Sequence, residues 1–315
     1  MKRMIKIVFI IILIILALIS IITFIFIKKL NEPVVKENYF KEVKSFGKLE
    51  KKYSSMGDYD VNSMEFDSNE DFFSKYKVWY PIDIEKSNTK YPLVVMANGT
   101  GVPYKKYEPI FEHLASWGFI VIGNDNESSG DGKSSSSGLD FMLSLNNNES
   151  SLFYNKIDID AIGIGGHSQG GVGAIHAVTD FENSRLFKTI YTASATTSSM
   201  IESWNLKGWD YDITKINIPV FMVAATGRVD AETISPLDDM KKNFEGLSDD
   251  IHAIMARRKN SDHGNMLVNA DSYMTAWFRY TLMNDIEAAK VFEGSNSELY
   301  MNNDNWQDVK VQNIK

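Results

Sequence analysis

Two patterns of apolar residues divide the chain. Residues 7–27 form one run without a charged side chain, whereas from about residue 56 onward short apolar runs alternate with polar stretches. About 21 residues, at about 1.5 Å each, can cross a hydrocarbon core of roughly 30 Å. The pattern therefore predicts a basic stub over 1–6, a transmembrane anchor over 7–27, a charged tether over 28–55 and a folded domain over 56–315.

The residues that flank the long apolar run predict its orientation. Lys2, Arg3 and Lys6 precede it, while Lys28 and Lys29 follow it and are soon diluted by acidic residues. Basic residues favour the cytoplasmic side, so we expect a single-pass protein of the cell membrane with its N-terminus inside and its folded domain outside. The exit "TFIFIKKL" offers no small-residue cleavage site, which favours an anchor over the alternative, secretion after signal cleavage.

The short apolar runs predict an α/β fold. Amphipathic stretches at 107–118 and 270–285 lie among them. Such alternation is typical of a mostly parallel central sheet with helices on both faces. The polar segment "NESSGDGKSSSSG", residues 126–138, is predicted to be an exposed loop at the carboxyl edge of the sheet, where ligands bind in this class of fold. Strands are predicted within 76–81, 91–99, 119–125, 159–166, 186–195, 218–227 and 251–259.

Charge and composition exclude several kinds of function. The formal net charge of -8, without a long basic stripe, argues against nucleic-acid binding. The absence of cysteine removes disulfides, thiolate metal sites and cysteine nucleophiles. The sequence leaves the oligomeric state open.

The segment "GGHSQGG" carries the clearest chemical signal. It has no lysine after its last glycine, so it is not a phosphate-binding P-loop, and the third glycine of a dinucleotide fingerprint would fall at Ser168. Gly166 to Gly170 instead match G-x-S-x-G between a predicted strand and a predicted helix. This context predicts Ser168 as a nucleophile on a tight turn, with the amide of Gln169 as one donor to an oxyanion.

A serine nucleophile needs a histidine base, and the chain has five histidines to consider. His113, His167 and His176 are expected to pack or lie on the surface, with His167 pointing away from the site within the turn. His252 opens a strand. His263 lies on the loop after the last predicted strand, at the same edge of the sheet as Ser168, and is the predicted base.

Further candidates complete the site. After the strand within 218–227, Asp230 and Glu232 could each orient the base; Asp230 is preferred and Glu232 stays open. The loop "NGTGVPY" could supply the amide of Thr100 as a second oxyanion donor. Trp204 and Trp209 either line a substrate pocket or cover the core.

The order of Thr100, Ser168, Asp230 and His263 resembles the α/β-hydrolase superfamily. Within it, "IDAIGIGGHSQGGVGAIHA" and "TISP" are most similar to the branch of dienelactone hydrolases, chlorophyllases and bacterial cutinase-like enzymes. The resemblance implies cleavage of carboxylic esters through an acyl-serine, without metal or cofactor. In the cutinase-like pattern, Glu232 is the residue at the acid's distance from the proline of "TISP".

The sequence departs from this branch at Asn98, where histidine is common, at Gln169, where methionine is frequent, and in lacking cysteines for the terminal disulfide of some members. The expected function is a membrane-anchored serine esterase acting on small-molecule or lipid-like esters. An acyltransferase, thioesterase or peptidase with the same triad, or a catalytically silent binding protein, are the alternatives.

Overall fold

The computed structural model describes residues 12, 14–24 and 32–314. Residues 14–24 are helical, and within the described residues no helix combines the length and the apolar character needed to cross a membrane. The predicted anchor over 7–27 lies partly outside the described residues. Residues 35–315 form a compact unit of their own, and the site lies in this unit.

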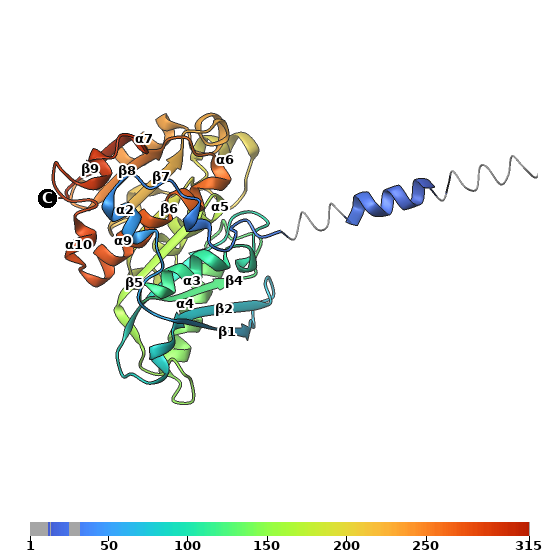
Figure 1. The fold of residues 1–315 in the computed structure, drawn as a ribbon, viewed down its shortest axis with the longest axis horizontal. Helices are drawn as coiled ribbons and strands as arrows, with labels where there is room; N and C mark the ends of the chain where they lie inside the picture. Colours follow the sequence, from blue (N-terminus) through green and yellow to red (C-terminus); the bar gives the residue numbers. More distant parts are fainter. Residues whose placement is uncertain (1–11, 13, 25–31, 315) are drawn as a thin grey trace, which may run out of the picture. The chain divides into compact units, whose positions relative to one another are not determined.

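A nine-stranded sheet forms the centre of this unit, in the order β1-β2-β4-β3-β5-β6-β7-β8-β9 (Figure 1). The neighbours from β4 to β8 pair in parallel, while β1, β2 and β9 run antiparallel to their neighbours. The strands are β1 Val61–Asp67, β2 Lys75–Pro81, β3 Tyr91–Ala97, β4 Ile120–Asn124, β5 Ile157–His167, β6 Phe187–Ala193, β7 Val220–Ala225, β8 Ala253–Arg258 and β9 Trp306–Gln312.

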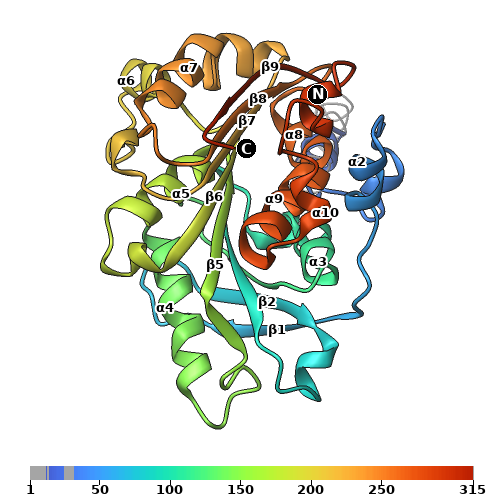
Figure 2. The same ribbon diagram turned by 90° about the vertical axis from the view of Figure 1, so that its left-hand side faces the viewer.

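Helices cover both faces of the sheet (Figure 2), so β3, β4 and β7 are buried along their whole length. In β3 every residue is buried; Val94 and Met96 pack into one core, and Leu93 and Val95 into the other. The first core includes α3 (Glu108–Ser116) and α9 (Asp271–Met283), and the second includes α4 (Lys133–Asn147), α5 (Gln169–Thr179) and α7 (Leu237–Gly246). The shorter helices are α2 Lys48–Tyr53, α6 Ser198–Trp204, α8 Met266–Asn269, α10 Ile286–Ala289 and α11 Glu298–Met301.

This architecture fits the expected α/β-hydrolase fold, and the seven predicted strands are confirmed as β2 to β8. The prediction of an exposed loop over 126–138 is largely wrong. Residues 126–132 form a loop, but only Glu127 and Ser128 of this loop are exposed, and the second half of the segment is helical. Lys133 begins α4, and Ser134, Ser135, Ser136 and Gly138 are buried in it. Serine and glycine are small enough to let the start of this helix lie close to its neighbours.

The predicted domain boundary at residue 56 is also corrected. Residues 35–55, which were expected to form part of a tether, belong to the compact unit. Val35, Tyr39 and Tyr53 are at most 3% exposed, and α2 lies in this segment. Charged residues separate these three, so the sequence shows no regular apolar period although the three side chains are buried.

Candidate active site

Ser168 stands on a sharp turn between β5 and α5. Its backbone has φ 59° and ψ -124°, a strained conformation for a residue other than glycine. The turn brings backbone segments so close that a Cβ on Gly166 would lie 2.0 Å from the carbonyl oxygen of Gly170, and one on Gly170 would lie 2.2 Å from that of Ala97. The amide of Ser168 donates to the Ala193 carbonyl at 2.9 Å, which fixes the turn against β6. The two glycines of the motif are thus required by close approach.

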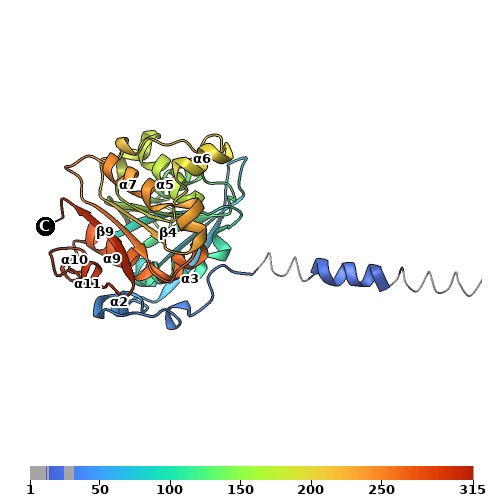
Figure 3. The same cartoon turned by 90° about the horizontal axis from the view of Figure 1, so that it is seen from above.

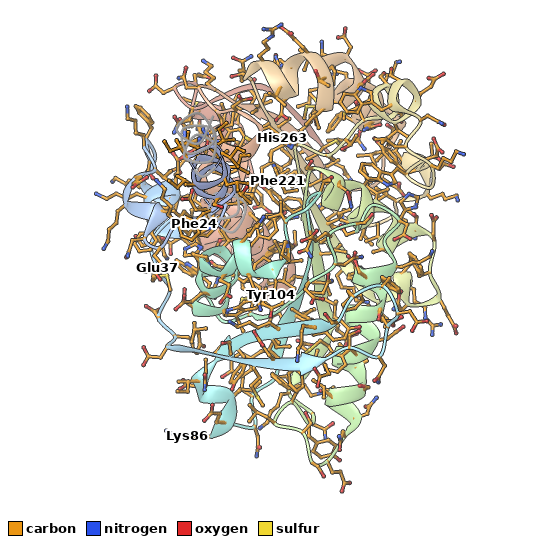
Figure 4. All side chains as sticks on the ribbon, turned by 90° about the vertical axis from the view of Figure 1, so that its right-hand side faces the viewer. Phe24, Glu37, Lys86, Tyr104, Phe221 and His263 are labelled. Atoms are coloured by element: carbon orange, nitrogen blue, oxygen red, sulfur yellow. The ribbon has the colours of Figure 1, made fainter. Side chains whose placement is uncertain are left out.

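His263, labelled in Figure 4, begins the short helical turn His263–Asn265 after β8. Its Nδ1 lies 2.6 Å from Oδ1 of Asp230, which begins the turn Asp230–Ile234 after β7. Asp230 is fully buried, whereas the His263 side chain is 20% exposed. Since Nδ1–H donates to the carboxylate, Nε2 is the nitrogen left to accept a proton.

The other candidate acid has a different partner. Glu232 is exposed and pairs with Arg228, whose Nε lies 2.9 Å from Oε2. The structure therefore places Asp230 against His263 and Glu232 on the surface.

Two further groups hold Asp230, and sequence reasoning missed both. Its Oδ2 accepts from the Ala225 amide at 2.8 Å and from the Ser194 hydroxyl. Ser194 directly follows β6, and no motif marks it in the sequence. With both oxygens occupied, the carboxylate is held in one orientation.

His167 connects the nucleophile turn to the base. Its Nε2 lies 2.9 Å from the His263 carbonyl oxygen, and the two rings are 4.6 Å apart between centroids. Burial, together with the neighbouring His263, lowers the pKa of His167 to about 4, so it is neutral near pH 7 and donates Nε2–H. The expectation that His167 points away from the site is wrong. His167 directly precedes Ser168, so this contact links the nucleophile turn to the loop that carries His263. Among the described residues, Ser168 Oγ makes no hydrogen bond to His263 or to any other residue.

The amides of Thr100 and Gln169 lie on the two loops where oxyanion donors were expected. Thr100 is exposed on the loop after β3, and Gln169 is the first residue of α5. Within the described part of the chain neither N–H donates to another residue, so both are free to bind a substrate oxygen.

The Gln169 side chain links three loops. Its side-chain amide is oriented so that the nitrogen and the oxygen both have hydrogen-bond partners. Nε2 donates to Thr100 Oγ1 at 2.7 Å, while Oε1 accepts from the amides of Ser129 at 2.5 Å and Gly130 at 3.1 Å. Asn98, at the end of β3, donates to the carbonyl oxygens of Asn124 and Asn126 at 2.7 and 2.8 Å. The departures from the family pattern at Gln169 and Asn98 thus hold the loop of Thr100.

The two tryptophans lie in different surroundings. Trp204, at the end of α6, is 63% exposed and so covers no core. Trp209 packs on the loop after β4, where a Cβ at Gly130 would lie 2.6 Å from its ring. Of the two, only Trp209 is therefore near the loop that holds Gln169.

In the described ranges, no three His, Asp or Glu side chains are arranged to hold a metal ion.

Comparison with known proteins identifies a family for most of the chain. Residues 50–309 match the PETase family model, described as PET hydrolase-like, an α/β-hydrolase family related to dienelactone hydrolases and cutinases. The match includes Ser168, Asp230 and His263. No curated protein matches the chain significantly.

Proposed function

Because the chain belongs to the PET hydrolase-like family, and this family suggests a hydrolase that acts on esters, we propose that it is a serine hydrolase that cleaves carboxylic esters through an acyl-serine intermediate. The observation that carries the proposal is the hydrogen-bonded pair of Asp230 and His263 beside the strained turn of Ser168. A carboxylate that fixes the tautomer of a histidine, next to a serine raised on a turn, is the arrangement that activates a hydroxyl near neutral pH.

Acylation begins when Nε2 of His263 takes the proton of Ser168 Oγ as this oxygen attacks the ester carbonyl carbon. Asp230 stabilises the imidazolium that forms. The amides of Thr100 and Gln169 donate to the oxyanion of the tetrahedral intermediate. When the intermediate collapses, the bond to the alcohol oxygen breaks, and His263 returns the proton to the leaving alcohol.

Deacylation repeats these steps with water. His263 removes a proton from the water molecule, whose oxygen attacks the acyl carbon, and the same amides stabilise the second oxyanion. Collapse releases the carboxylic acid and returns the proton to Ser168 Oγ. Every proton passes through His263.

We further propose that residues 7–27 anchor the protein in the cell membrane, with the catalytic domain outside. The uncharged run and the excess of basic residues before it support this proposal. The substrates we expect are esters of short acyl chains, because the chain has no long insertion that could form a lid.

Hydrolysis of p-nitrophenyl esters from acetate to octanoate tests the catalytic proposal. We expect the full-length protein to hydrolyse them with a preference for short acyl chains, and Ser168→Ala to have lost this activity. Equal rates in both proteins, or a folded wild type that cleaves none of the series, would contradict the proposal. An added alcohol acceptor shows whether part of the acyl group is transferred rather than hydrolysed.

A further inference from the structure

Residues 35–55, here called the N-terminal strap, lie against the part of the domain that carries His263. The helix of the strap, α2, lies beside α9 and α11 (Figure 3). Glu298 of α11 accepts from the amides of Leu49 at 2.8 Å and Glu50 at 2.5 Å. Most of the strap precedes residue 50, where the family match begins.

The chain from Arg258 to Asp271, here called the His263 loop, connects β8 to α9. One polar contact of the strap reaches the start of this loop. Glu50 is buried, and its Oε1 lies 2.8 Å from Nη1 of Arg258, the last residue of β8. The same carboxylate accepts from Nδ2 of Asn302 at 3.0 Å and of Asn305 at 3.1 Å. The carbonyl oxygen of Asn305 in turn accepts from the amide of Lys259 at 2.7 Å. Glu50 thus fixes the point where the chain leaves β8 towards His263.

A second polar contact reaches the other end of this loop. The hydroxyl of Tyr39 donates to Oδ2 of Asp271, the first residue of α9, at 2.6 Å. Nδ1 of His113 lies 2.8 Å from the same oxygen, and all three side chains are buried. Burial and the nearby Asp271 raise the pKa of Tyr39 well above its usual value, so the phenol keeps the proton that it donates.

We propose that the strap positions the catalytic histidine, with Glu50 and Tyr39 as positioning residues that hold the two ends of the loop from Arg258 to Asp271. This inference rests on the proposed function, in which His263 is the base. His263 lies between the two held ends, and its own contacts to Asp230 and His167 depend on where the loop lies. A displacement of the base by about 1 Å can reduce a rate about 100-fold, so a fixed loop favours turnover.

The polar contacts go beyond what attachment of the strap requires. Val35, Tyr39 and Tyr53 already bury apolar surface. A buried carboxylate is costly unless it is paired, and an apolar residue of similar size would pack at least as well. Glu50 and the carbonyl oxygen of Lys44 reach the Arg258 end of the loop, and Tyr39 reaches its Asp271 end. Contacts at both ends are the arrangement expected if the strap sets the position of the loop.

Tyr39→Phe and Glu50→Gln in the full-length protein test the inference. Both keep the shape of the side chain, and Tyr53→Phe is the matched control, because its hydroxyl lies 3.5 Å from Asp285, away from the His263 loop. We expect Tyr39→Phe and Glu50→Gln to lower kcat for p-nitrophenyl butyrate about tenfold with KM within about twofold, and Tyr53→Phe to change neither. Urea unfolding verifies that each variant is folded under the assay conditions.

A second readout does not depend on ester turnover. The proton between His263 Nδ1 and Asp230 gives a downfield NMR signal, which we expect to shift or broaden in Tyr39→Phe and Glu50→Gln but not in Tyr53→Phe. An unchanged kcat and an unchanged signal in folded Tyr39→Phe and Glu50→Gln would overturn the inference, as would equal losses in Tyr53→Phe. A wild type whose turnover does not require Ser168 would instead contradict the proposed function, and the NMR signal would still decide the role of the strap.

Discussion

Asp230 has both carboxylate oxygens occupied by groups that hold it in one orientation. Oδ1 faces His263 Nδ1 at 2.6 Å, and Oδ2 accepts from the Ala225 amide at 2.8 Å and from Ser194. Glu232 is exposed and paired with Arg228. Of the two candidate acids, only Asp230 is placed to fix the tautomer of His263 and to stabilise its imidazolium.

Replacing the two acids separately tests this assignment. We expect Asp230→Asn to lower kcat by about 10³- to 10⁴-fold, because an amide cannot stabilise the imidazolium and favours the wrong tautomer. Glu232→Gln should stay within about twofold of the wild type, since an exposed ion pair contributes little. Steady-state kinetics on one p-nitrophenyl ester gives both values, and the reverse ranking would make Glu232 the acid.

His167 predicts a loss of stability in acid. Burial, with the neighbouring His263, lowers its pKa to about 4, below the value of about 6.5 expected in the unfolded chain. Between about pH 6.5 and pH 4, the imidazole of His167 is therefore protonated in the unfolded chain but mostly neutral in the folded one. The stability that His167 contributes is complete above about pH 6.5 and is lost as the pH falls towards 4, by roughly 2 to 3 kcal/mol between pH 7 and pH 4.5.

The variant His167→Gln measures this effect, because its amide can still donate to the His263 carbonyl but does not titrate. The free energy of unfolding, measured with urea at pH 7 and at pH 4.5, should fall less in the variant than in the wild type. The expected difference between the two falls is roughly 2 to 3 kcal/mol. Equal losses in the two proteins would show that His167 does not titrate in this range.

The role of His167 was missed in the sequence because its partner His263 is distant along the chain, while Ser168 could be recognised from its neighbours alone.

At the scale of elements, the loop after β3 is held to the start of α5 by one side chain. Gln169 Nε2 donates to Thr100 Oγ1 at 2.7 Å, and its Oε1 is held by two amides of the loop after β4. The spacing of the two proposed oxyanion donors, the amides of Thr100 and Gln169, therefore depends on the Gln169 side chain as well as on the backbone.

A double-mutant cycle with Gln169→Leu and Thr100→Val tests this link, since both variants keep the backbone amides. We expect each to lower kcat about tenfold, less than the 10²- to 10³-fold cost of removing an oxyanion donor, with little change in KM. The double variant should lose no more than Gln169→Leu alone, because Thr100→Val removes only a contact that Gln169→Leu has already removed. Additive losses, or an effect on KM alone, would contradict the link.

The strands that position the site could be predicted because parallel central strands are buried on both faces and so appear as short apolar runs. The edge strands β1 and β9 were missed, since most of their residues are exposed or half-buried and the sequence there is largely polar. The start of α4 was also missed because its buried residues are serines and glycine, which are usual in loops. These errors leave the positions of Ser168, Asp230 and His263 unaffected.

At the scale of the whole molecule, the strap shows the limit of sequence reasoning. Its buried side chains are few, and the residues that make polar contacts with the strap, Arg258, Asp271 and Glu298, lie more than two hundred residues further along the chain. No local period can reveal such contacts. The consequence is that the compact unit begins at residue 35, before the start of the family match.

The proposed anchor is tested by fractionation. We expect the full-length protein to stay with the membranes after carbonate extraction, and a chain that begins at residue 32 to remain in the supernatant with unchanged kcat, because it keeps the whole strap. Protease added to intact cells should digest the catalytic domain. Full-length protein in the soluble fraction, or a domain protected from protease, would contradict the anchor or its orientation.

The most direct test of the central claim is covalent labelling of Ser168 by a fluorophosphonate, followed by mass spectrometry of the peptides. We predict one adduct, on the peptide that contains Ser168, with ester hydrolysis lost in proportion to labelling and with no adduct in Ser168→Ala. Labelling that is equal in Ser168→Ala, or an enzyme that hydrolyses esters while Ser168 stays unlabelled, would contradict a serine nucleophile at this position.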